Sequence, residues 1–310
     1  MNKIVFLDEY SIAGRDMSKV SEQGDYTAYE NTRKEDVVER LKGATIAISN
    51  KVMIDGEAMR QLPDLKLICV AATGMNNVDL ATAKELGIEV KNAVGYSTSA
   101  VAETTLASAL ALARHIVYFD EYFHDGRYAN ADRAFCFDRL TFEIRGKKWG
   151  IVGLGNIGRE VARLATAFGC EVRYFSTSGA KREEAYPAME LNELLEWSDI
   201  LSVHSPLNER TRGLIGREEL KRMKPSAMII NVARGGIIDE AALAEALDNG
   251  WVSAAALDVF SVEPLRESPL YNIKDRYRLL GSPHNAWAAS EAIDRLIDCV
   301  AENIRTFLEK

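Results

Sequence analysis

The stretch of sequence that decides the fold runs from Lys147 to Gly169 and reads KKWGIVGLGNIGREVARLATAFG. Its apolar residues Trp149–Val152 predict a short buried strand, and the next six residues, Gly153–Gly158, have the spacing G-x-G-x-x-G. Beyond them, apolar residues recur at intervals of three and four, which predicts a helix that ends at Gly169. A glycine-rich turn between a strand and a helix is typical of dinucleotide-binding βα units; the alternative is a turn that only joins the two elements.

Each glycine of this turn has its own physical reason. Gly153 permits the tight turn, Gly155 lets the backbone approach a pyrophosphate, and Gly158 lets the helix pack closely on the strand. The first backbone N–H groups of the helix then face the phosphate charge. The pattern therefore predicts that this part of the chain binds a dinucleotide cofactor.

Composition and charge narrow the class of protein. The 310 residues suffice for two domains, and 47% hydrophobic with 27% charged residues is ordinary for a soluble protein. The net charge of −8, without a basic cluster, argues against nucleic acid as a partner. The first residues show no signal-peptide pattern and no apolar stretch reaches membrane-spanning length, so we expect no membrane contact. Four scattered cysteines without a C-x-x-C pair predict no metal site and no disulfide, and hence a cytoplasmic protein.

Short apolar runs alternate with helical patterns on both sides of the glycine turn, which predicts an α/β protein with parallel sheets. Before the turn the apolar runs are Lys3–Leu7, Tyr26–Ala28, Ala44–Ile48, Leu65–Ala71 and Ile88–Lys91, with helical patterns at Lys34–Leu41 and Asp79–Leu86. After the turn the runs are Val172–Phe175, Ile200–His204, Ala227–Val232, Ala254–Leu257 and Arg278–Leu280, with helical patterns at Leu191–Trp197, Arg217–Met223 and Glu240–Asn249.

Two domains follow from the position of the glycine turn in the middle of the chain. We expect residues 1–96 to form a flavodoxin-like substrate domain and residues 97–287 to form a Rossmann-type dinucleotide-binding domain. The last amphipathic pattern, Ser290–Leu308, comes after the final strand. We therefore expect residues 288–310 to return to the first domain, with the active-site cleft between the two.

The junction between the domains carries a helix and an aromatic segment. Ser97–Ser99 is suited to capping a helix, and Ala100–His115 is apolar nearly all round, which predicts a buried helix. This helix serves either the core alone or also a domain bridge and a subunit contact. Phe119–Leu140 holds aromatic residues among charges without clear periodicity, so we interpret it as an extended arm or a partner-facing surface, with an ordinary surface loop as the alternative.

Three segments place reactive side chains just after buried strands, where ligands bind in parallel α/β sheets. Arg234 follows an apolar strand and can grip a carboxylate with two hydrogen bonds. Asp258 and Glu263 come just past the run Ala254–Leu257. His284, one of four histidines, follows the last run and is a candidate proton donor. Taken singly, each has an ordinary surface charge as its alternative.

Together with the glycine turn, these segments resemble the D-2-hydroxyacid dehydrogenases over essentially the full length of the chain. The matching motifs are GLGNIG at Gly153–Gly158, NVARGGIIDE at Asn231–Glu240, LDVFSVEP at Leu257–Pro264 and SPHNAW at Ser282–Trp287. Four motifs in the right order and spacing are far more specific than any one of them. Within the family the chain looks most like the glycerate dehydrogenases, also called hydroxypyruvate reductases.

The resemblance implies the residues that carry the reaction. Arg234 would anchor a 2-oxo acid by its carboxylate, His284 would give a proton to the ketone oxygen, and Glu263 would hold the imidazole. Cofactor contacts are implied for Gly153, Gly155, Asn156, Ile157, Gly158, Ser205, Pro206, Thr211, Val232, Ala233, Arg234 and Asp258. The implied reaction is the NAD(P)H-dependent reduction of a small 2-oxo acid, such as hydroxypyruvate or glyoxylate, to the D-2-hydroxy acid, and the reverse.

The same resemblance places substrate contacts in the first domain. Thr73, Gly74 and Met75 look like the loop whose backbone amides receive the substrate carboxylate. Asn50 and Lys51 look like the neighbouring loop, which faces the side group of the substrate. Substrate size in this family is set by loop shape, so the identity of the 2-hydroxy acid stays open.

Cofactor choice is predicted from the residues after the run Val172–Phe175. An acidic residue about 20 positions beyond the glycines usually holds the ribose hydroxyls of NAD. Here Ser176 and Thr177 follow the strand, with Lys181 and Arg182 soon after. With no carboxylate to repel a 2′-phosphate and with bases to meet one, we expect NADP(H); the alternative is a loop that tolerates NAD without discriminating.

Two further expectations concern partners and the class of function. Family members are generally dimers, and the apolar helix and aromatic arm exceed what one core needs, so we expect a homodimer joined through the nucleotide domains. Relatives with the same fold serve as cofactor-sensing transcriptional corepressors, which is the competing function; the intact set of Arg234, Glu263 and His284 favours the enzyme. Glu263 also stands where formate dehydrogenases carry glutamine, which disfavours that branch.

Overall fold

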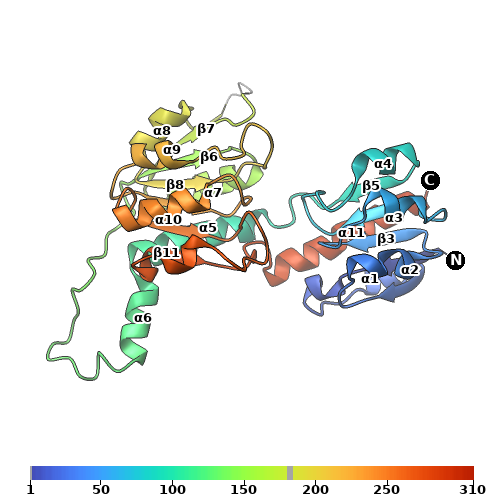
Figure 1. The fold of residues 1–310 in the computed structure, drawn as a ribbon, viewed down its shortest axis with the longest axis horizontal. Helices are drawn as coiled ribbons and strands as arrows, with labels where there is room; N and C mark the ends of the chain where they lie inside the picture. Colours follow the sequence, from blue (N-terminus) through green and yellow to red (C-terminus); the bar gives the residue numbers. More distant parts are fainter. Residues whose placement is uncertain (1, 180–183) are drawn as a thin grey trace. The chain divides into compact units, whose positions relative to one another are not determined.

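The computed structural model describes residues 2–179 and 184–310, and the chain divides into two compact units. Unit 1 comprises Met1–Ser97 and Ala288–Lys310, and unit 2 comprises Thr98–Trp287. Figure 1 shows that each unit contains a sheet with helices packed against it. The strands in both sheets are parallel, as the alternation of apolar runs and helical patterns predicts. The predicted α/β class is therefore confirmed.

Unit 1 has a five-stranded sheet with the order β2-β1-β3-β4-β5. Its strands are β1 (Lys3–Phe6), β2 (Asp25–Ala28), β3 (Ile46–Ser49), β4 (Leu67–Val70) and β5 (Glu89–Asn92). This is the flavodoxin-like order, in which the winding of the chain reverses between β1 and β3. β3 and β4 are buried along their whole length, because the sheet is covered on both faces.

Helices lie on both faces of the unit 1 sheet. They are α1 (Ser18–Ser21), α2 (Val37–Leu41), α3 (Gly56–Arg60), α4 (Leu80–Glu85) and α11 (Ser290–Leu308), with 3₁₀ turns at Glu9–Ile12 and Lys34–Asp36. Residues of α2, α3 and α4 share one hydrophobic core with alternate residues of the strands, among them Val5 and Ile68. α11 packs instead against β4, β5 and α1.

The last helix of the chain completes unit 1. α11 buries one face, made of Ala292, Ile293, Leu296, Ile297, Val300, Ala301 and Ile304. Its polar side chains also hold the segment around β5: Arg295 Nε donates to the Tyr96 carbonyl at 2.8 Å, and Asn303 Nδ2 donates to the Asn92 carbonyl at 3.0 Å. Two chain segments far apart in sequence are thereby joined by apolar packing and by hydrogen bonds to backbone carbonyls.

Unit 2 has a six-stranded sheet with the order β11-β10-β9-β8-β6-β7. Its strands are β6 (Lys148–Val152), β7 (Glu171–Phe175), β8 (Ile200–Val203), β9 (Met228–Asn231), β10 (Ala254–Leu257) and β11 (Leu279–Gly281). Tyr174 of β7 forms a further parallel bridge with Ala188, on the outer edge of the sheet. With this bridge as a minimal extra strand, the order is that of a doubly wound dinucleotide-binding sheet, and the winding reverses between β6 and β8.

The helices of unit 2 also cover both faces of its sheet. They are α5 (Thr98–Ala113), α6 (Ile116–His124), α7 (Asn156–Ala167), α8 (Leu191–Trp197), α9 (Arg217–Arg222) and α10 (Glu240–Asn249), with 3₁₀ turns at Pro269–Asn272 and Arg276–Arg278. α5 and α7 share a core with Trp149 and Ile151, whereas α8, α9 and α10 share another with Val152 and Leu201 on the opposite face. The buried Trp149 indole donates to Ser202 Oγ at 2.9 Å, so its polar atom is satisfied.

The predicted apolar helix is α5, which lies in the core of unit 2. Its residues Ala102, Ala109 and Ala113 are completely buried, and such small side chains let α7 pack closely against it. No single helix in the described ranges is long and apolar enough to cross a membrane. α5 and α6 pass that test only as a pair bent by 62°, on length and composition alone.

The segment predicted as an irregular arm is partly helical. α6 extends to His124, so the first residues of the segment that was interpreted as an extended arm are helical, and the alternative of an ordinary surface loop is wrong for them. Tyr118 and Tyr122 lie one helical turn apart with ring centroids 6.2 Å apart, and the Arg127 guanidinium lies 5.1 and 4.8 Å from those rings. This stacking stabilises the helix. The residues between α6 and β6, all of which the structure describes, contain no helix or strand.

The close packing of α7 on β6 predicts the effect of a single methyl group. A Cβ on Gly158 would lie 2.3 Å from the Gly153 carbonyl oxygen, which is backbone and has little freedom to move. We expect Gly158→Ala to lower the free energy of unfolding by about 1–3 kcal/mol, measured by chemical denaturation. Gly155→Ala is the control, because a Cβ there meets no atom within 4 Å. Equal stability of the two variants would contradict this account of the packing.

Candidate active site

The glycine turn lies where the winding of the unit 2 sheet reverses. Gly153 follows β6 with a φ of 94°, a left-handed conformation that glycine adopts without strain. A Cβ on Gly153 would lie 3.0 Å from the backbone of Ser205, in the loop after β8. Gly155 caps α7 and has open space beside it, next to the first helical residues Asn156 and Ile157. A helix N-terminus beside open space is suited to binding a phosphate.

A pocket of about 190 Å³ opens beside this turn. Its lining consists of Gly153, Leu154, Gly155, Tyr174, Ser176, Thr177, Ser178, Glu184, His204, Ser205 and Pro206. Two buried polar atoms of this lining, Ser205 Oγ and His204 Nδ1, have no hydrogen-bond partner within the described part of the chain. Buried polar atoms are rarely left in this state, so both indicate a ligand, and with the glycine turn they fit a dinucleotide.

His204 is not among the residues predicted from the sequence. Burial lowers the pKa of His204 to about 3, so its ring is neutral at physiological pH. Nε2 lies 3.0 Å from Ser202 Oγ, which already accepts the indole N–H of Trp149. With Nε2 engaged by Ser202, Nδ1 is the ring atom that faces the pocket without a partner in the described part of the chain. His204 thereby offers a ligand one nitrogen of a neutral imidazole.

The residues that follow β7 line the same pocket, and so does one carboxylate, that of Glu184. Ser176 and Thr177, predicted to meet the ribose, are half-buried there. Glu184 also lines the pocket, and Arg159 binds it through Nε at 3.0 Å from Oε2 and through Nη2 on Oε1. The expectation that no carboxylate stands here is therefore wrong, because Glu184, which lies outside the strand-end motif, also lines the pocket.

Other residues predicted for the cofactor lie in the loops after β8 and β9. Pro206 lines the pocket, whereas the buried Thr211 hydroxyl donates to the Pro206 carbonyl at 2.6 Å and so shapes the loop itself. Val232 and Ala233 directly follow β9. The basic residues 181–182, on which the expectation of NADP(H) also drew, lie outside the described residues.

The three predicted catalytic residues stand in loops after three neighbouring strands. Arg234 follows β9, Glu263 follows β10 and His284 follows β11, and the carboxyl ends of parallel strands meet at one edge of a sheet. Gly235 makes the closest approach between these loops, since a Cβ there would lie 1.9 Å from the Phe260 carbonyl carbon. The loop of Arg234 is thus packed directly against the loop of Glu263, and only glycine fits at the contact.

The Glu263 carboxylate and the His284 imidazole form a hydrogen-bonded pair. Glu263 Oε2 lies 2.7 Å from His284 Nδ1, and Oε1 accepts the backbone N–H of Phe260 at 2.9 Å. With Nδ1 engaged, Nε2 is the ring atom left for proton transfer. The side chains of Glu263 and His284 are 34% and 23% exposed, so a small solute reaches them.

The turn that carries Arg234 is shaped by the last residue of β9. Asn231 Nδ2 donates to the Arg234 carbonyl at 2.9 Å, and Asn231 Oδ1 accepts the Ala233 N–H at 3.1 Å. Arg234 Nη1 donates to the Ala233 carbonyl at 2.6 Å. A guanidinium has five N–H donors, so Nε and Nη2 can still hold a carboxylate with two parallel bonds.

Asp258 fixes the loop in which His284 lies. Its buried carboxylate accepts three hydrogen bonds from that loop: from Ser282 Oγ at 2.6 Å, from the Asn285 N–H at 2.8 Å and from the Ala286 N–H at 3.0 Å. His284 has a φ of 56°, a left-handed conformation that is uncommon for a residue with a side chain. Asp258, predicted as a cofactor contact, therefore also positions the candidate proton donor.

A second buried carboxylate lies in unit 1, where the winding of its sheet reverses between β1 and β3. Asp8 accepts the N–H groups of Asn50, Lys51 and Val52 at 2.8, 2.6 and 3.2 Å. Burial raises the pKa of Asp8, and the three N–H bonds oppose that rise. Asn50 is buried, and its Nδ2 has no partner within the described residues. Asp8 thus fixes the loop that was predicted to face the substrate, although the sequence did not single it out.

The other predicted substrate loop of unit 1 follows β4. Thr73 Oγ1 donates to the Ala93 carbonyl at 3.0 Å, and Asn92 Nδ2 donates to the Thr73 carbonyl at 2.7 Å. The side chain of Met75 packs on the core beneath α2, α3 and α4. These contacts fix the backbone of the loop around Gly74.

The chain matches the family described as "D-isomer specific 2-hydroxyacid dehydrogenase, NAD binding domain" over residues 106–286. The chain belongs to this family. It is 39% identical to a glycerate dehydrogenase of Methylorubrum extorquens, over 99% of the chain and 96% of the relative. It is 35% identical to a hydroxypyruvate reductase of Blautia hydrogenotrophica, over 99% of the chain and 97% of the relative. The resemblance stated from the motifs is therefore confirmed.

Solved structures of similar dehydrogenases hold nicotinamide cofactors. An acyclic imino acid reductase in complex with NADPH and D-Arg matches with a TM-score of 0.86 and 29% identity, covering 99% of the chain and 97% of that structure. A D-lactate dehydrogenase from Aquifex aeolicus complexed with NAD and lactic acid matches with a TM-score of 0.85 and 25% identity, covering 99% and 96%. Unit 2 is accordingly the NAD-binding domain of a 2-hydroxyacid dehydrogenase. In residues 2–179 and 184–310, no group of three or more His, Cys, Asp or Glu side chains is placed to hold a metal ion.

The role of the Asp258 carboxylate in this dehydrogenase predicts the effect of an isosteric change. Asp258→Asn turns an NH₂ group toward donors of the His284 loop, so at least one of them loses its acceptor. A buried donor without a partner costs about 1–3 kcal/mol, and we expect a loss of unfolding free energy of this size in chemical denaturation. Asp132→Asn, at an exposed position beyond α6, serves as the control. If both variants unfold like the unmodified protein, the hydrogen bonds that Asp258 accepts do not stabilise the His284 loop.

Proposed function

We propose that this dehydrogenase reduces small 2-oxo acids of the hydroxypyruvate or glyoxylate kind to D-2-hydroxy acids with NAD(P)H, and catalyses the reverse reaction. The observation that carries the proposal is the 2.7 Å contact between Glu263 and His284, in loops packed against that of Arg234. The names of the relatives, glycerate dehydrogenase and hydroxypyruvate reductase, support the substrate class, as does a related structure with lactic acid.

The residues of unit 2 supply binding and proton transfer. Arg234 holds the carboxylate of the oxo acid with two parallel N–H···O bonds and brings positive charge to the ketone. His284, protonated, donates from Nε2 to the ketone oxygen, while Glu263 holds the ring through Nδ1. The reduced nicotinamide, when bound, supplies the hydride that the substrate carbon accepts. One C–H bond and one O–H bond form, which converts the ketone into the hydroxyl group.

We propose that two loops of unit 1 also contact the substrate. The backbone N–H groups of Thr73, Gly74 and Met75 bind its carboxylate, and Asn50 and Lys51 face its side group. The buried Nδ2 of Asn50, which has no partner in the described part of the chain, supports this role. The hydrogen bonds from the Asn50 and Lys51 backbone to a buried carboxylate keep the second loop in one conformation.

Of the two cofactors, we infer a preference for NADP(H). Hydroxyl residues, Ser176 and Thr177, directly follow β7, where a carboxylate would read the ribose of NAD. Arg210 Nη1 donates to the Ser178 carbonyl at 3.3 Å, which brings a guanidinium group to this loop. A related structure in complex with NADPH indicates that a protein of this fold can admit the 2′-phosphate.

We further propose a homodimer joined through unit 2. Figure 1 shows that α6 and the green segment after it extend away from the sheet of this unit. This segment carries strongly exposed apolar residues, Phe135, Phe137 and Leu140, which are 67%, 72% and 76% exposed. Apolar side chains exposed to this degree are typical of surfaces that another chain covers.

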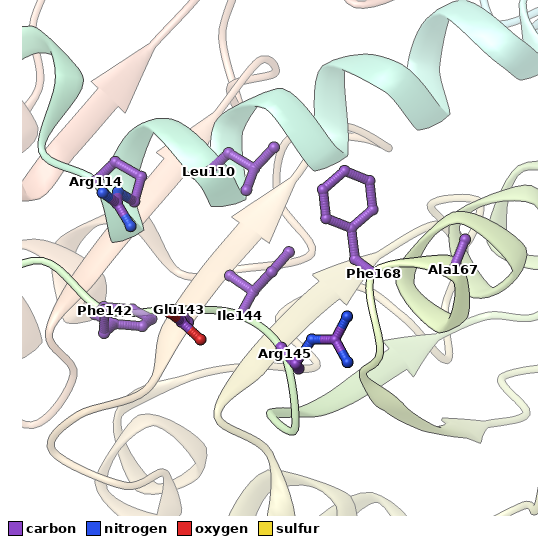
Figure 2. A pocket seen from close by; sticks show the side chains of 8 residues that line it. All are labelled: Leu110, Arg114, Phe142, Glu143, Ile144, Arg145, Ala167 and Phe168. Atoms are coloured by element: carbon purple, nitrogen blue, oxygen red, sulfur yellow. The ribbon is translucent and has the colours of Figure 1, made fainter.

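A second surface of unit 2, lined by apolar and charged side chains, supports the same interface. Figure 2 shows side chains from α5, from the segment before β6 and from the end of α7 gathered around a pocket of about 340 Å³. Leu110, Phe142 and Phe168 give this pocket apolar walls that a second copy can cover. The charged side chains in its lining are Arg114, Glu143 and Arg145. Light scattering at micromolar concentration should report the mass of two chains. The mass of one chain would contradict the interface.

The function is tested by assaying a panel of 2-oxo acids with NADPH and with NADH. We expect hydroxypyruvate and glyoxylate to be reduced with a higher kcat/KM than long or branched 2-oxo acids. Chiral chromatography should identify the glycerate formed from hydroxypyruvate as the D isomer, whereas the glycolate formed from glyoxylate has no stereocentre. If the protein binds the reduced cofactor and yet oxidises it with none of these acids, it is a cofactor-sensing protein and the proposed enzyme activity is wrong.

The proton donor is tested by replacing His284 with alanine. We expect kcat for reduction to fall by about 10²–10⁴, the range for loss of a general acid, with the affinity for NADPH unchanged. His124→Ala, at an exposed position on α6, serves as the control and should keep the unmodified kcat. A kcat for His284→Ala equal to that of the control would show that another group gives the proton.

A further inference from the structure

One carboxylate that lines the pocket beside the glycine turn belongs to an ion pair that no part of the proposed reaction uses. Glu184 lines this pocket with a side chain only 12% exposed. Arg159, in the first turn of α7, binds both of its carboxylate oxygens, through Nε to Oε2 at 3.0 Å and through Nη2 to Oε1. A two-pronged contact of this kind fixes both side chains and pairs their charges.

Glu184 is the one charged side chain among the described residues that line this pocket, since His204 is neutral. A bare carboxylate beside Ser176 and Thr177 would accept hydrogen bonds from ribose hydroxyls and repel a 2′-phosphate. Arg159 changes this balance, because its charge offsets that of Glu184. The guanidinium also keeps the N–H groups of Nη1, which the contact with Glu184 does not use, as donors to a phosphate oxygen.

We propose that the Arg159–Glu184 pair sets the choice between NADP(H) and NAD(H). In this pair Glu184 favours the free ribose hydroxyls, and Arg159 admits the 2′-phosphate by offsetting the carboxylate. The proposal deepens the proposed function and rests on it for the use of a nicotinamide dinucleotide. It adds Arg159 and Glu184 as specificity-determining residues. The sequence pattern alone indicates only the loop at Ser176 for this role.

The two partners of the pair have opposite predicted effects. Arg159→Gln removes the Arg159 charge that offsets the Glu184 carboxylate, so the ratio of NADPH affinity to NADH affinity should fall about tenfold. Glu184→Gln removes the repulsion and releases Arg159, so the same ratio should rise about tenfold. The double variant has neither charge and should return close to the unmodified ratio.

Direct binding is the measurement, with each reduced cofactor titrated against the full chain and followed by its fluorescence. Arg163→Gln is the matched control, because Arg163 lies on the same helix and pairs with Glu160 by Nε at 3.0 Å and Nη2 at 2.6 Å. Its ratio should stay unchanged. Opposite shifts for the two single variants support the proposal, since neither misfolding nor a general loss of packing raises one ratio and lowers the other.

Equal changes in the affinities for NADPH and NADH, in either single variant, would overturn the proposal and leave the pair with a structural role only. Binding needs no turnover, so the outcome is separate from that of the proposed function. Opposite shifts in a protein that reduces no 2-oxo acid would sustain the cofactor inference and refute the reaction. An active dehydrogenase whose variants keep the unmodified ratio of NADPH affinity to NADH affinity would support the proposed reaction and refute the cofactor inference.

Discussion

The buried carboxylate of Asp258 is the interaction on which the arrangement of the site depends. It lies after β10 and accepts three hydrogen bonds from the loop after the neighbouring strand β11. These bonds hold the loop in which His284 takes its left-handed conformation, which costs a non-glycine residue free energy that the surrounding contacts must offset. Because Glu263 follows Asp258 in the same loop, the position of the imidazole and the position of its partner are set together by two adjacent strands.

Unit 1 uses the same physical device at the corresponding place in its own sheet. Asp8 follows β1 and binds three consecutive backbone N–H groups in the loop after β3. In both units a carboxylate at the end of one strand takes up backbone donors that would otherwise be buried without partners, and so fixes a loop beside a strand end. The dinucleotide turn differs, because Gly155 leaves open space and the Ser205 hydroxyl has no partner among the described residues. These groups are therefore available to a ligand rather than to the chain.

Local patterns predicted much of this structure, and contacts between distant residues account for what they missed. The spacing of apolar residues and glycines marks the glycine turn, the alternation of strands and helices, and the strand-end motifs. The α/β class and the family could therefore be predicted from the sequence. The five-residue helix α3 is too short for apolar periodicity to mark it. The pairing of Glu184 with Arg159 joins residues 25 positions apart in the sequence, and no local pattern specifies such a contact. Asp8, just after the first strand, was not singled out either, because its partners lie more than 40 residues away in the sequence.

We propose that Glu263 acts through His284 to move one proton, and a double-mutant cycle in kcat tests this role most directly. The account predicts that Glu263→Gln lowers kcat for reduction of the oxo acid in the otherwise unmodified protein. In the His284→Ala background the same substitution should leave kcat where it was, since the group that it positions is gone. Equal losses of kcat in the two backgrounds would show that Glu263 acts independently and would contradict the account.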